Sequence, residues 1–285
     1  MISKASHAPR VKVIFFGTPD YVIPVLETLH KNFKLVAVVT QPPKLVGRTQ
    51  VKTFTHVDNW SYKRKDIKIL RELDIKEFPK ADLGIVASYG KIIPQNIISH
   101  FKYGILNIHP SLLPKYRGAS PIQSQIIDGV LETGVTVIKM DAKMDHGPIL
   151  SSLRDEIEPQ DTNETLRKRL FERSAQFLVE LIPNYVSQKV KPKIQKEEEA
   201  TFTKIIDREN GQVDFGKDDP KLIERKFRAL QPWPGIYTII DGKRIKILGL
   251  HLYSDKLILD KVQLEGKKAV SFEEFRRGYP QMKFS

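Results

Sequence analysis

The first forty residues alternate between strand-like and helix-like patterns. VKVIFFG (11–17) and FKLVAVVT (33–40) are nearly continuous apolar runs, and YVIPVLETLHK lies between them after a TPD turn. Apolar runs of this kind predict strands buried on both faces, and strands joined through a helix run parallel. We expect Thr18 to cap that helix and Pro19 to be its first residue. The opening therefore predicts a parallel sheet covered by helices.

The later segments extend this pattern and then change it. Further strands are predicted by apolar runs at 81–90, 103–109, 133–141 and 149–157. A helical repeat follows Asp161, so we expect an α/β fold with a Rossmann-like, mostly parallel sheet over residues 11–185. The polar stretch 186–203 is typical of a linker. Residues 204–285 contain short alternating runs separated by DG, SD and EG turns, which predict a small C-terminal β-barrel of the OB-like type.

The composition excludes several kinds of chemistry. The first strand–helix turn holds a single glycine, Gly17, whereas a dinucleotide-binding turn needs three. The chain has no cysteine and no metal-ligand spacing of other residues, so we expect neither disulfides nor a metal. No apolar stretch approaches the roughly 18 residues of a membrane span, and the first ten residues lack the apolar core of a secretory signal. We therefore expect a cytoplasmic protein with no membrane partner.

Basic residues gather toward both ends of the chain. The net charge is +13; residues 1–65 carry eleven Lys or Arg against three Asp or Glu, and residues 191–285 carry twenty against fifteen. This distribution favours a polyanionic partner, with nucleic acid the first candidate. A solvated basic surface without such a partner would give the same counts, so charge alone leaves both interpretations open.

A polar pair interrupts one of the predicted strands. In LNIHPSLLPKYRG (106–118), Asn107 and His109 are two residues apart and therefore share one face of the strand. Pro110 ends the strand there, and ligands of open α/β sheets bind beyond the carboxyl ends of the strands. An amide donor beside an imidazole suits a reaction with a transient oxyanion. A pair that only satisfies buried backbone groups is the alternative.

Two aspartates lie in the loop after the alternating strand. They are Asp141 and Asp145 of KMDAKMDHGPIL (139–150). An aspartate that reaches His109 would fix its tautomer. The plainer interpretation of Asp145 is a turn residue.

Three segments together resemble the N10-formyltetrahydrofolate-dependent formyltransferases. They are FFGTPDYVIPVLETL, SYGKIIP and NIHPSLLPKYRGASPIQSQIIDGVLETGVTVIKMDAKMDHGPIL. The resemblance implies that 10-formyltetrahydrofolate is the co-substrate, that Asn107, His109 and Asp145 are the catalytic residues, and that no metal is needed. The folate site that it implies consists of Tyr89, Gly90, Ser111, Leu112, Leu113 and Pro114, with the 139–145 loop beside the pterin.

The C-terminal segments resemble the second domain of those members that formylate methionine on initiator tRNA. These segments are ATFTKIIDRENGQVDF, IERKFRALQPWPGIYTIIDGKRIKI and QLEGKKAVSFEEFRRGY. The resemblance implies methionyl initiator tRNA as the partner, contacted by a basic loop at 41–65 and by residues 204–285, and we expect a monomer. The implied tRNA-binding residues are Lys44, Arg48, Lys52, Lys63, Arg64, Lys65, Arg225, Arg228, Lys243 and Arg244. Trp60 is expected to be available for base stacking.

Three alternatives belong to other substrate or function classes. Glycinamide ribonucleotide formyltransferases share NIHPSLLP but generally have one domain. Sugar-nucleotide amine formyltransferases keep a similar second domain, and the basic 41–65 loop argues against them. A catalytically silent RNA-binding relative would be expected to have lost part of the Asn107, His109 and Asp145 set. The sequence departs from the family at His146, where threonine is frequent, and lacks a lysine-rich tract after Arg48.

Overall fold

The computed structural model describes residues 11–47 and 49–284, which pack into two compact units. The first unit contains the described residues up to Arg117 together with Gly134–Asp155 and Arg167–Thr201. The second contains Gly118–Thr133, Glu156–Leu166 and the described residues from Phe202 onward. Each unit therefore combines segments that are far apart in the chain, and the linear boundaries expected at 185 and 204 stay a prediction. Within the described ranges, no helix has the length and apolar character needed to cross a membrane.

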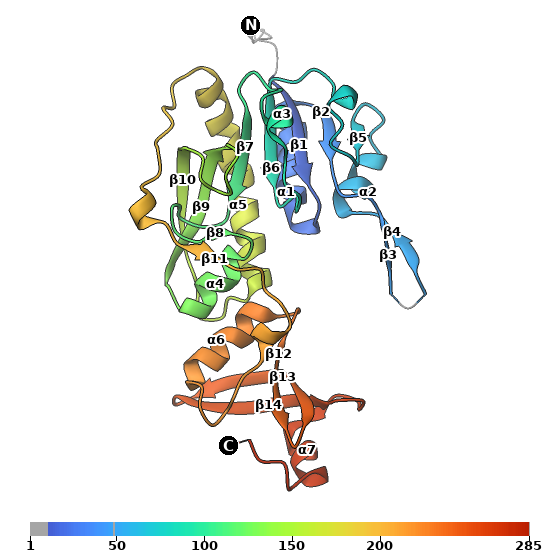
Figure 1. Ribbon diagram of the computed structural model, residues 1–285, viewed down its shortest axis with the longest axis vertical. Coiled ribbons are helices and arrows are strands. Elements are labelled where there is room, and N and C mark those ends of the chain that lie inside the picture. The colour runs from blue at the N-terminus through green and yellow to red at the C-terminus, as the bar shows by residue number, and fades with distance from the viewer. Residues whose placement is uncertain (1–10, 48, 285) are drawn as a thin grey trace, which may run out of the picture. The chain divides into compact units, whose positions relative to one another are not determined.

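A seven-stranded sheet of order β10-β9-β7-β6-β1-β2-β5 forms the centre of the first unit (Figure 1). Its strands are β1 (Lys12–Gly17), β2 (Lys34–Val39), β5 (Lys68–Leu70), β6 (Leu83–Ala87), β7 (Ile105–His109), β9 (Glu132–Lys139) and β10 (Ile149–Glu156). β1 runs parallel to β2 and β6, β2 to β5, and β6 to β7, whereas β7 and β9 are antiparallel. The mostly parallel sheet that we expected is confirmed.

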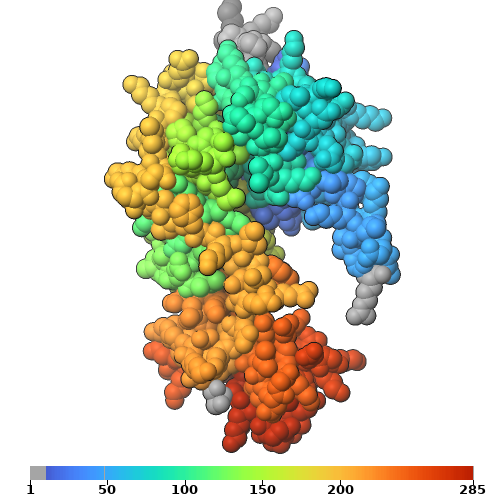
Figure 2. Space-filling model, in the orientation of Figure 1, coloured from blue at the N-terminus to red at the C-terminus, as the bar shows by residue number. Residues whose placement is uncertain are grey.

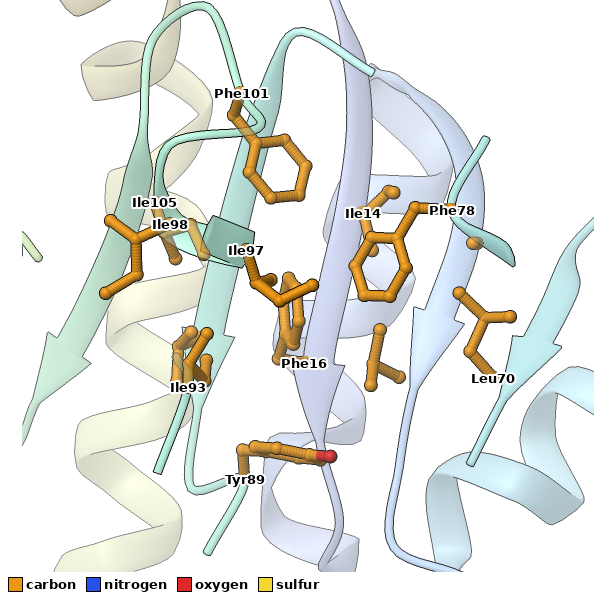
Figure 3. Packing of buried hydrophobic residues seen from close by; sticks show 13 residues of the cluster. Ile14, Phe16, Leu70, Phe78, Tyr89, Ile93, Ile97, Ile98, Phe101 and Ile105 are labelled. Atoms are coloured by element: carbon orange, nitrogen blue, oxygen red, sulfur yellow. The ribbon is translucent and has the colours of Figure 1, made fainter. Parts of the chain in front are cut away.

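One face of this sheet carries an apolar core rich in aromatic rings (Figure 3). Phe16 of β1 is fully buried, and its ring meets those of Tyr89 and Phe101 edge-on, with centroids 5.9 and 6.2 Å apart. The short helix α3 (Gln95–Ile98) adds Ile97 to the same cluster. This packing fixes the chain just beyond the carboxyl end of β6, which is the neighbour of β7 in the sheet.

The first helix begins later than the sequence predicts. Asp20–Val22 form a 3₁₀ turn and α1 covers Ile23–Asn32, so Pro19 precedes the helix instead of opening it. Thr18 Oγ1 donates a hydrogen bond to the carbonyl oxygen of Tyr89 at 2.9 Å. A contact with the segment after β6 therefore takes the place of the local cap. The helix expected after Asp161 is present as α5 (Asn163–Val186).

The region between β2 and β6 contains elements that the sequence did not indicate. β3 (Lys44–Val46) and β4 (Val51–Thr53) pair antiparallel into a hairpin that projects from the first unit (Figures 1 and 2). α2 (His56–Tyr62) follows, and the Thr55 hydroxyl caps it by accepting from the main-chain nitrogen of Asp58 at 3.0 Å. The buried Asp58 carboxylate accepts two hydrogen bonds from Arg71, at 2.7 and 3.0 Å. This ion pair ties α2 to the residue after the edge strand β5.

The second unit holds an antiparallel sheet and a pair of packed helices. β12 (Ile236–Ile240), β13 (Lys243–Tyr253), β14 (Lys256–Leu264) and β15 (Val270–Ser271) pair antiparallel in chain order. The C-terminal strands that we expected are thereby confirmed as an antiparallel sheet, and its closure into an OB-like barrel stays a prediction. α4 (Pro121–Asp128) packs against α6 (Pro220–Leu230), and α7 (Phe272–Gly278) follows the sheet. The shortest elements are β8 (Arg117–Gly118), β11 (Phe202–Thr203) and the 3₁₀ turns Ile75–Glu77, Glu197–Glu199 and Glu209–Gly211.

Candidate active site

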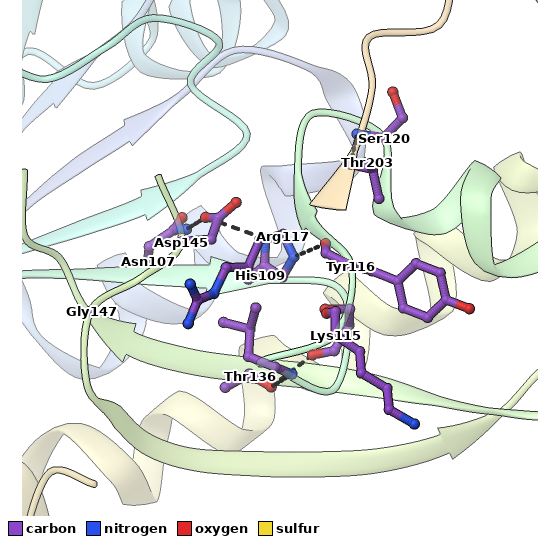
Figure 4. A network of polar contacts seen from close by, with 12 residues as sticks. Asn107, His109, Lys115, Tyr116, Arg117, Ser120, Thr136, Asp145, Gly147 and Thr203 are labelled. Carbon is purple, nitrogen blue, oxygen red and sulfur yellow. Dashed lines mark hydrogen bonds and ion pairs between the residues drawn. The ribbon is translucent and has the colours of Figure 1, made fainter. Parts of the chain in front are cut away.

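Asn107, His109 and Asp145 meet at the carboxyl end of β7 (Figure 4). Asn107 Nδ2 donates to Asp145 Oδ1 at 3.1 Å, and His109 Nδ1 lies 3.4 Å from the same oxygen. Both side chains of β7 therefore contact one carboxylate, which confirms that they share a face of the strand. The His109 ring is 4% exposed, so its contacts are made largely away from water.

A main-chain carbonyl fixes the orientation of the His109 ring. His109 Nε2 lies 2.9 Å from the carbonyl oxygen of Tyr116, an atom that only accepts hydrogen bonds. Nε2 therefore carries a hydrogen, and in the neutral ring the lone pair is on Nδ1, facing Asp145. We expected Asp145 to set this tautomer, but the carbonyl of Tyr116 does so. Asp145 is instead placed to stabilise a second proton on Nδ1.

The loop that carries Asp145 folds back tightly on β9. Asp145 adopts a left-handed backbone conformation with φ +50°, which is uncommon for a residue with a side chain. Two residues later, a β-carbon at Gly147 would lie 1.9 Å from the carbonyl oxygen of Lys139. Only glycine fits this approach, and it brings the loop close enough for Asp145 to reach Asn107 and His109.

These three side chains supply the parts of an acyl-transfer site. Asn107 is a neutral donor, the His109 imidazole is a group that can donate or accept a proton, and the Asp145 carboxylate faces Nδ1 of its ring. Donors fixed before the reaction stabilise a developing oxyanion without reorganising. Among the described residues, no group of three His, Cys, Asp or Glu side chains is arranged to hold a metal.

The predicted folate residues fall into two environments. Ser111 is fully buried; its hydroxyl donates to the carbonyl oxygen of Lys115 at 2.7 Å, which favours a role in shaping the loop over direct contact with folate. Leu113 is also buried, and its main-chain nitrogen donates to Thr136 Oγ1 at 3.1 Å. Leu112 and Pro114 are partly exposed. The loop thus presents alternate residues outward.

Tyr89 and Gly90 lie just beyond β6, next to the carboxyl end of β7. Burial raises the pKa of the Tyr89 hydroxyl to about 12, and that hydroxyl has no hydrogen-bond partner among the described residues. The main-chain carbonyl oxygen of Tyr89 accepts a hydrogen bond from Gln41 Nε2 at 3.0 Å. Gly90 is exposed with φ +78°, and a β-carbon there would lie 2.6 Å from Gln41 Nε2. The ring of Tyr89 belongs to the core, so a ligand would meet the main chain at this point.

The basic residues predicted around the hairpin differ in what their side chains contact. Lys44, Lys52, Lys63 and Lys65 are exposed, and Arg48 lies outside the described residues. Arg64 lies 3.6 Å from the centroid of the Trp60 ring and donates to the Trp60 carbonyl oxygen at 2.7 Å. Trp60 Nε1 donates to Glu27 at 3.3 Å. The expectation that Trp60 is free for stacking is therefore not supported: its ring is covered by Arg64 and half-buried beside α1.

Two of the four predicted C-terminal arginines and lysines are held inside their own unit. Arg225 Nε donates to the carbonyl oxygen of Ile127 at 2.9 Å, and Arg228 pairs with Glu224 at 2.6 Å. These contacts favour structural roles for both arginines. Lys243 is exposed, and Arg244 lines an open cavity of about 550 Å³ on the C-terminal sheet. The Arg244 guanidinium also lies 4.1 Å from the centroid of the Tyr237 ring, so Lys243 is the one exposed side chain of the four.

Sequence reasoning missed a second set of polar residues behind the site. Arg117, Gln195 and Glu197 form a hydrogen-bonded group, in which Arg117 is 2% exposed and donates to both others. His146 Nδ1 lies 2.6 Å from Asp141 and its Nε2 lies 3.4 Å from Glu197, so the unusual histidine links the loop to this group. No local pattern marks Gln195 or Glu197, because they stand in a polar stretch typical of a linker.

Comparisons with known proteins identify the family of the chain. Residues 10–182 match the Formyl transferase family and residues 205–257 match Formyl transferase, C-terminal domain. A methionyl-tRNA formyltransferase of Caldanaerobacter subterraneus subsp. tengcongensis is 38% identical over 247 residues, which cover 83% of this chain and 79% of that protein.

Two solved structures share the fold at 19% identity. The methionyl-tRNA formyltransferase from Clostridium thermocellum superimposes with a TM-score of 0.60, over 89% of this chain and 98% of that one. An N-formyltransferase from Helicobacter canadensis, in complex with folinic acid and dTDP-3-aminofucose, superimposes with a TM-score of 0.66, over 92% of this chain and 98% of that one. Since the first family match alone spans more than half of the sequence, the chain belongs to the formyl transferase family.

Proposed function

We propose that this chain transfers the formyl group of 10-formyltetrahydrofolate to the free amino group of methionyl initiator tRNA. The observation that carries the proposal is the meeting of Asn107, His109 and Asp145 at the end of β7 in a chain that matches formyl transferases in both of its parts. The relative from Caldanaerobacter, named methionyl-tRNA formyltransferase, supports the choice of acceptor. The reaction serves translation initiation, and we place it in the cytoplasm.

The loops around the trio suit a flat heteroaromatic co-substrate. Met144, next to Asp145, is 64% exposed, and Ile92, two residues after Gly90, is 86% exposed. We propose that these two exposed side chains contact the ring system of the folate. Gly90 is exposed as well and carries no side chain of its own. When bound, the folate supplies the formyl group.

Asn107 and His109 then act on the oxygen of the formyl carbonyl. An amine with a pKa of about 7.7–8.0 is partly neutral at physiological pH, so it needs placement more than a strong base. The Asn107 amide and a protonated His109 Nδ1 stabilise the negative charge that grows on that oxygen as the amine nitrogen bonds to the formyl carbon. His109, oriented by Asp145, passes its proton to the departing N10 of the folate as the C–N bond breaks, and takes up the proton that the attacking amine nitrogen loses, so the imidazole returns to its starting state.

Exposed lysines on the first unit support a nucleic-acid acceptor. Lys44 and Lys52 lie on the projecting hairpin, and Lys63 and Lys65 follow α2. Phosphate contacts by such lysines are sequence-independent and weaken with salt. We propose that the protein meets the tRNA as a monomer.

The decisive experiment is a formylation assay with three acceptors in parallel. The purified protein and 10-formyltetrahydrofolate are incubated with methionyl initiator tRNA, methionyl elongator tRNA or a nucleotide-linked aminosugar. We expect formyl-methionine on the initiator tRNA, little on the elongator tRNA, and none on the sugar. Formylation of the sugar alone would overturn the proposal in favour of the alternative that the Helicobacter canadensis complex suggests. His109→Ala should abolish turnover while leaving tRNA affinity within about twofold, since His109 is 4% exposed and offers almost no surface to the tRNA. Light scattering of the free protein and of the complex tests the monomer.

A further inference from the structure

Gln195 has every hydrogen-bonding position of its side chain in use. Its Nε2 donates to the carbonyl oxygens of Asp145 and Gly147, both at 2.8 Å. Its Oε1 accepts from Arg117 Nε and Nη2, at 3.1 and 2.9 Å. An amide offers two hydrogens and two lone pairs, so all four are satisfied. The residue is buried, where each such bond matters more than it would in water.

Arg117, the partner of Gln195, is held through both its side chain and its main chain. The Arg117 guanidinium is held by Glu197 as well, at 2.7 and 3.0 Å, so it cannot turn without breaking several contacts. Its main-chain nitrogen donates to the carbonyl oxygen of Thr201 at 2.9 Å. The preceding residue is Tyr116, whose nitrogen donates to Thr201 Oγ1 at 2.8 Å. The segment 195–201 therefore forms hydrogen bonds with residues 116 and 117 through both main chain and side chains.

These contacts close a ring around the candidate active site. His109 Nε2 bonds the carbonyl of Tyr116, Arg117 bonds Gln195, Gln195 bonds the main chain of Asp145, and Asp145 Oδ1 returns to His109 Nδ1 at 3.4 Å. The imidazole stands at the end of β7 and the carboxylate on the loop after β9. The Gln195 side chain donates to the main chain of Asp145 and accepts from Arg117, the residue after the carbonyl that His109 contacts.

We propose that Gln195 is a positioning residue that sets the separation between His109 and Asp145, and so controls the chemical step rather than substrate binding. The inference rests on the proposed formyl transfer for its kinetic readout but not for its structural one. It assigns a role in the active site to a residue of the segment that the sequence predicted as a linker. Because the residue touches the main chain of Asp145 and not the reacting atoms, its effect should pass through the catalytic pair.

The sharpest variant is Gln195→Glu. The glutamate has the same shape and can still accept from Arg117, but it offers carboxylate oxygen instead of N–H to the carbonyls of Asp145 and Gly147. Acceptors facing acceptors repel, so the loop should move away from β7. A displacement on the scale of 1 Å costs a well-placed catalytic group about 10²-fold in rate. We expect kcat to fall about 10²-fold, with KM for both substrates within about threefold.

Two variants separate this effect from loss of folding. Gln195→Met keeps the length and removes all four hydrogen bonds, and should show a smaller loss of kcat than the glutamate, because it removes the contacts without adding repulsion. Glu199→Gln changes an exposed residue of the same segment, whose contact is an ion pair with Lys196, and should behave as wild type. Urea unfolding of each variant corrects the rates for the folded fraction.

A structural readout keeps the inference testable whichever acceptor is used. In crystal structures of the wild type and of Gln195→Glu, we expect the His109 Nδ1 to Asp145 Oδ1 separation to grow while the bond from His109 Nε2 to Tyr116 is kept. If wild type formylates an acceptor other than tRNA, the same loss of kcat is expected with it, so failure of the proposed function leaves this test intact. An unchanged separation, a kcat within threefold of wild type, or a rise in KM alone would overturn the proposal.

Discussion

Replacing Gly147 by alanine should impair the candidate active site while the rest of the fold stays intact. A β-carbon at this position would lie 1.9 Å from the carbonyl oxygen of Lys139, whereas real side-chain carbons essentially never come within 3.0 Å of another heavy atom. Something must therefore move by about 1.1 Å (3.0 − 1.9). Lys139 is the last residue of β9 and pairs with Leu106 of β7, so the strand is the more rigid partner. The displacement should fall on the loop that carries Asp145.

The size of the effect follows from what that loop holds. Gln195 donates to the carbonyl oxygen of Gly147 at 2.8 Å, and a shift of this size takes the contact beyond the roughly 3.2 Å limit of a good hydrogen bond. A misplacement of about 1 Å costs about 10²-fold in rate, and forcing one extra carbon into a packed site costs about 1–3 kcal/mol of stability. Since domains unfold with about 5–15 kcal/mol, the variant should stay folded.

Steady-state formylation and urea unfolding test this prediction together. We expect kcat about 10²-fold lower than wild type and an unfolding free energy about 1–3 kcal/mol lower. Gly278→Ala is the matched control, because no atom lies within 4 Å of its β-carbon position at the end of α7. A Gly147→Ala enzyme with kcat within threefold of wild type would refute the reasoning, since the loop would then tolerate the movement without loss of catalytic geometry.

Three further changes test other parts of the structure. Asp58→Asn should lower the unfolding free energy by about 1–3 kcal/mol in urea, because the buried carboxylate accepts both Arg71 hydrogen bonds; an unchanged midpoint would show that the pair contributes nothing. The hydrogen bond from Arg117 lowers the pKa of Glu197 below its ordinary 4.5, so the stabilising contribution is present above pH 4.5 and is lost as the pH falls through the lower folded-state value. Glu197→Gln should therefore flatten the acid side of the stability profile below pH 4.5, and an identical profile would contradict this. Replacing Lys63 and Lys65 together by alanine should reduce the slope of log tRNA affinity against log salt by about 2, and Arg225→Ala, whose guanidinium is held inside its unit, should leave the slope unchanged.

The sheet was predictable because its signal is local. Residues 11–17 and 33–40 are nearly continuous apolar runs, which are typical of parallel strands buried on both faces in an α/β fold. The meeting of Asn107 and His109 was also predictable, since strand geometry places alternate residues on one face. Resemblance to a family then selected Asp145 among the loop aspartates, a choice that spacing alone left open.

The environment of single side chains was not predictable, because it depends on contacts between distant segments. Thr18 has the composition of a helix cap, yet it bonds the carbonyl of Tyr89, 71 residues later. Trp60 looks available for stacking until Arg64 and Glu27 are seen to cover it. Arg225 carries the charge of a phosphate ligand but bonds a carbonyl oxygen 98 residues away. In each case the residue type suits both the predicted role and the observed one, and the neighbours in the folded structure determine which of the two it takes.

The same dependence explains why the candidate catalytic groups can be proposed from sequence, whereas the distances between them cannot. Tyr116 and Asp145 are both non-glycine residues in the left-handed region, at φ +62° and +50°, a conformation that costs on the order of 1–3 kcal/mol each. Such conformations persist only where the surroundings over-determine them. Both main chains are held from one place: Thr201 binds Tyr116 and Gln195 binds Asp145, across 85 and 50 residues of sequence. The motif around His109 thus contains candidate reacting groups, while the segment 195–201 provides the hydrogen bonds that hold the backbones of Tyr116 and Asp145 in place. Glycine at position 145 would relax the left-handed backbone there, but Asp145→Gly would also remove the carboxylate. The constraint is therefore better tested by substituting Gln195 or Thr201, which hold the two main chains.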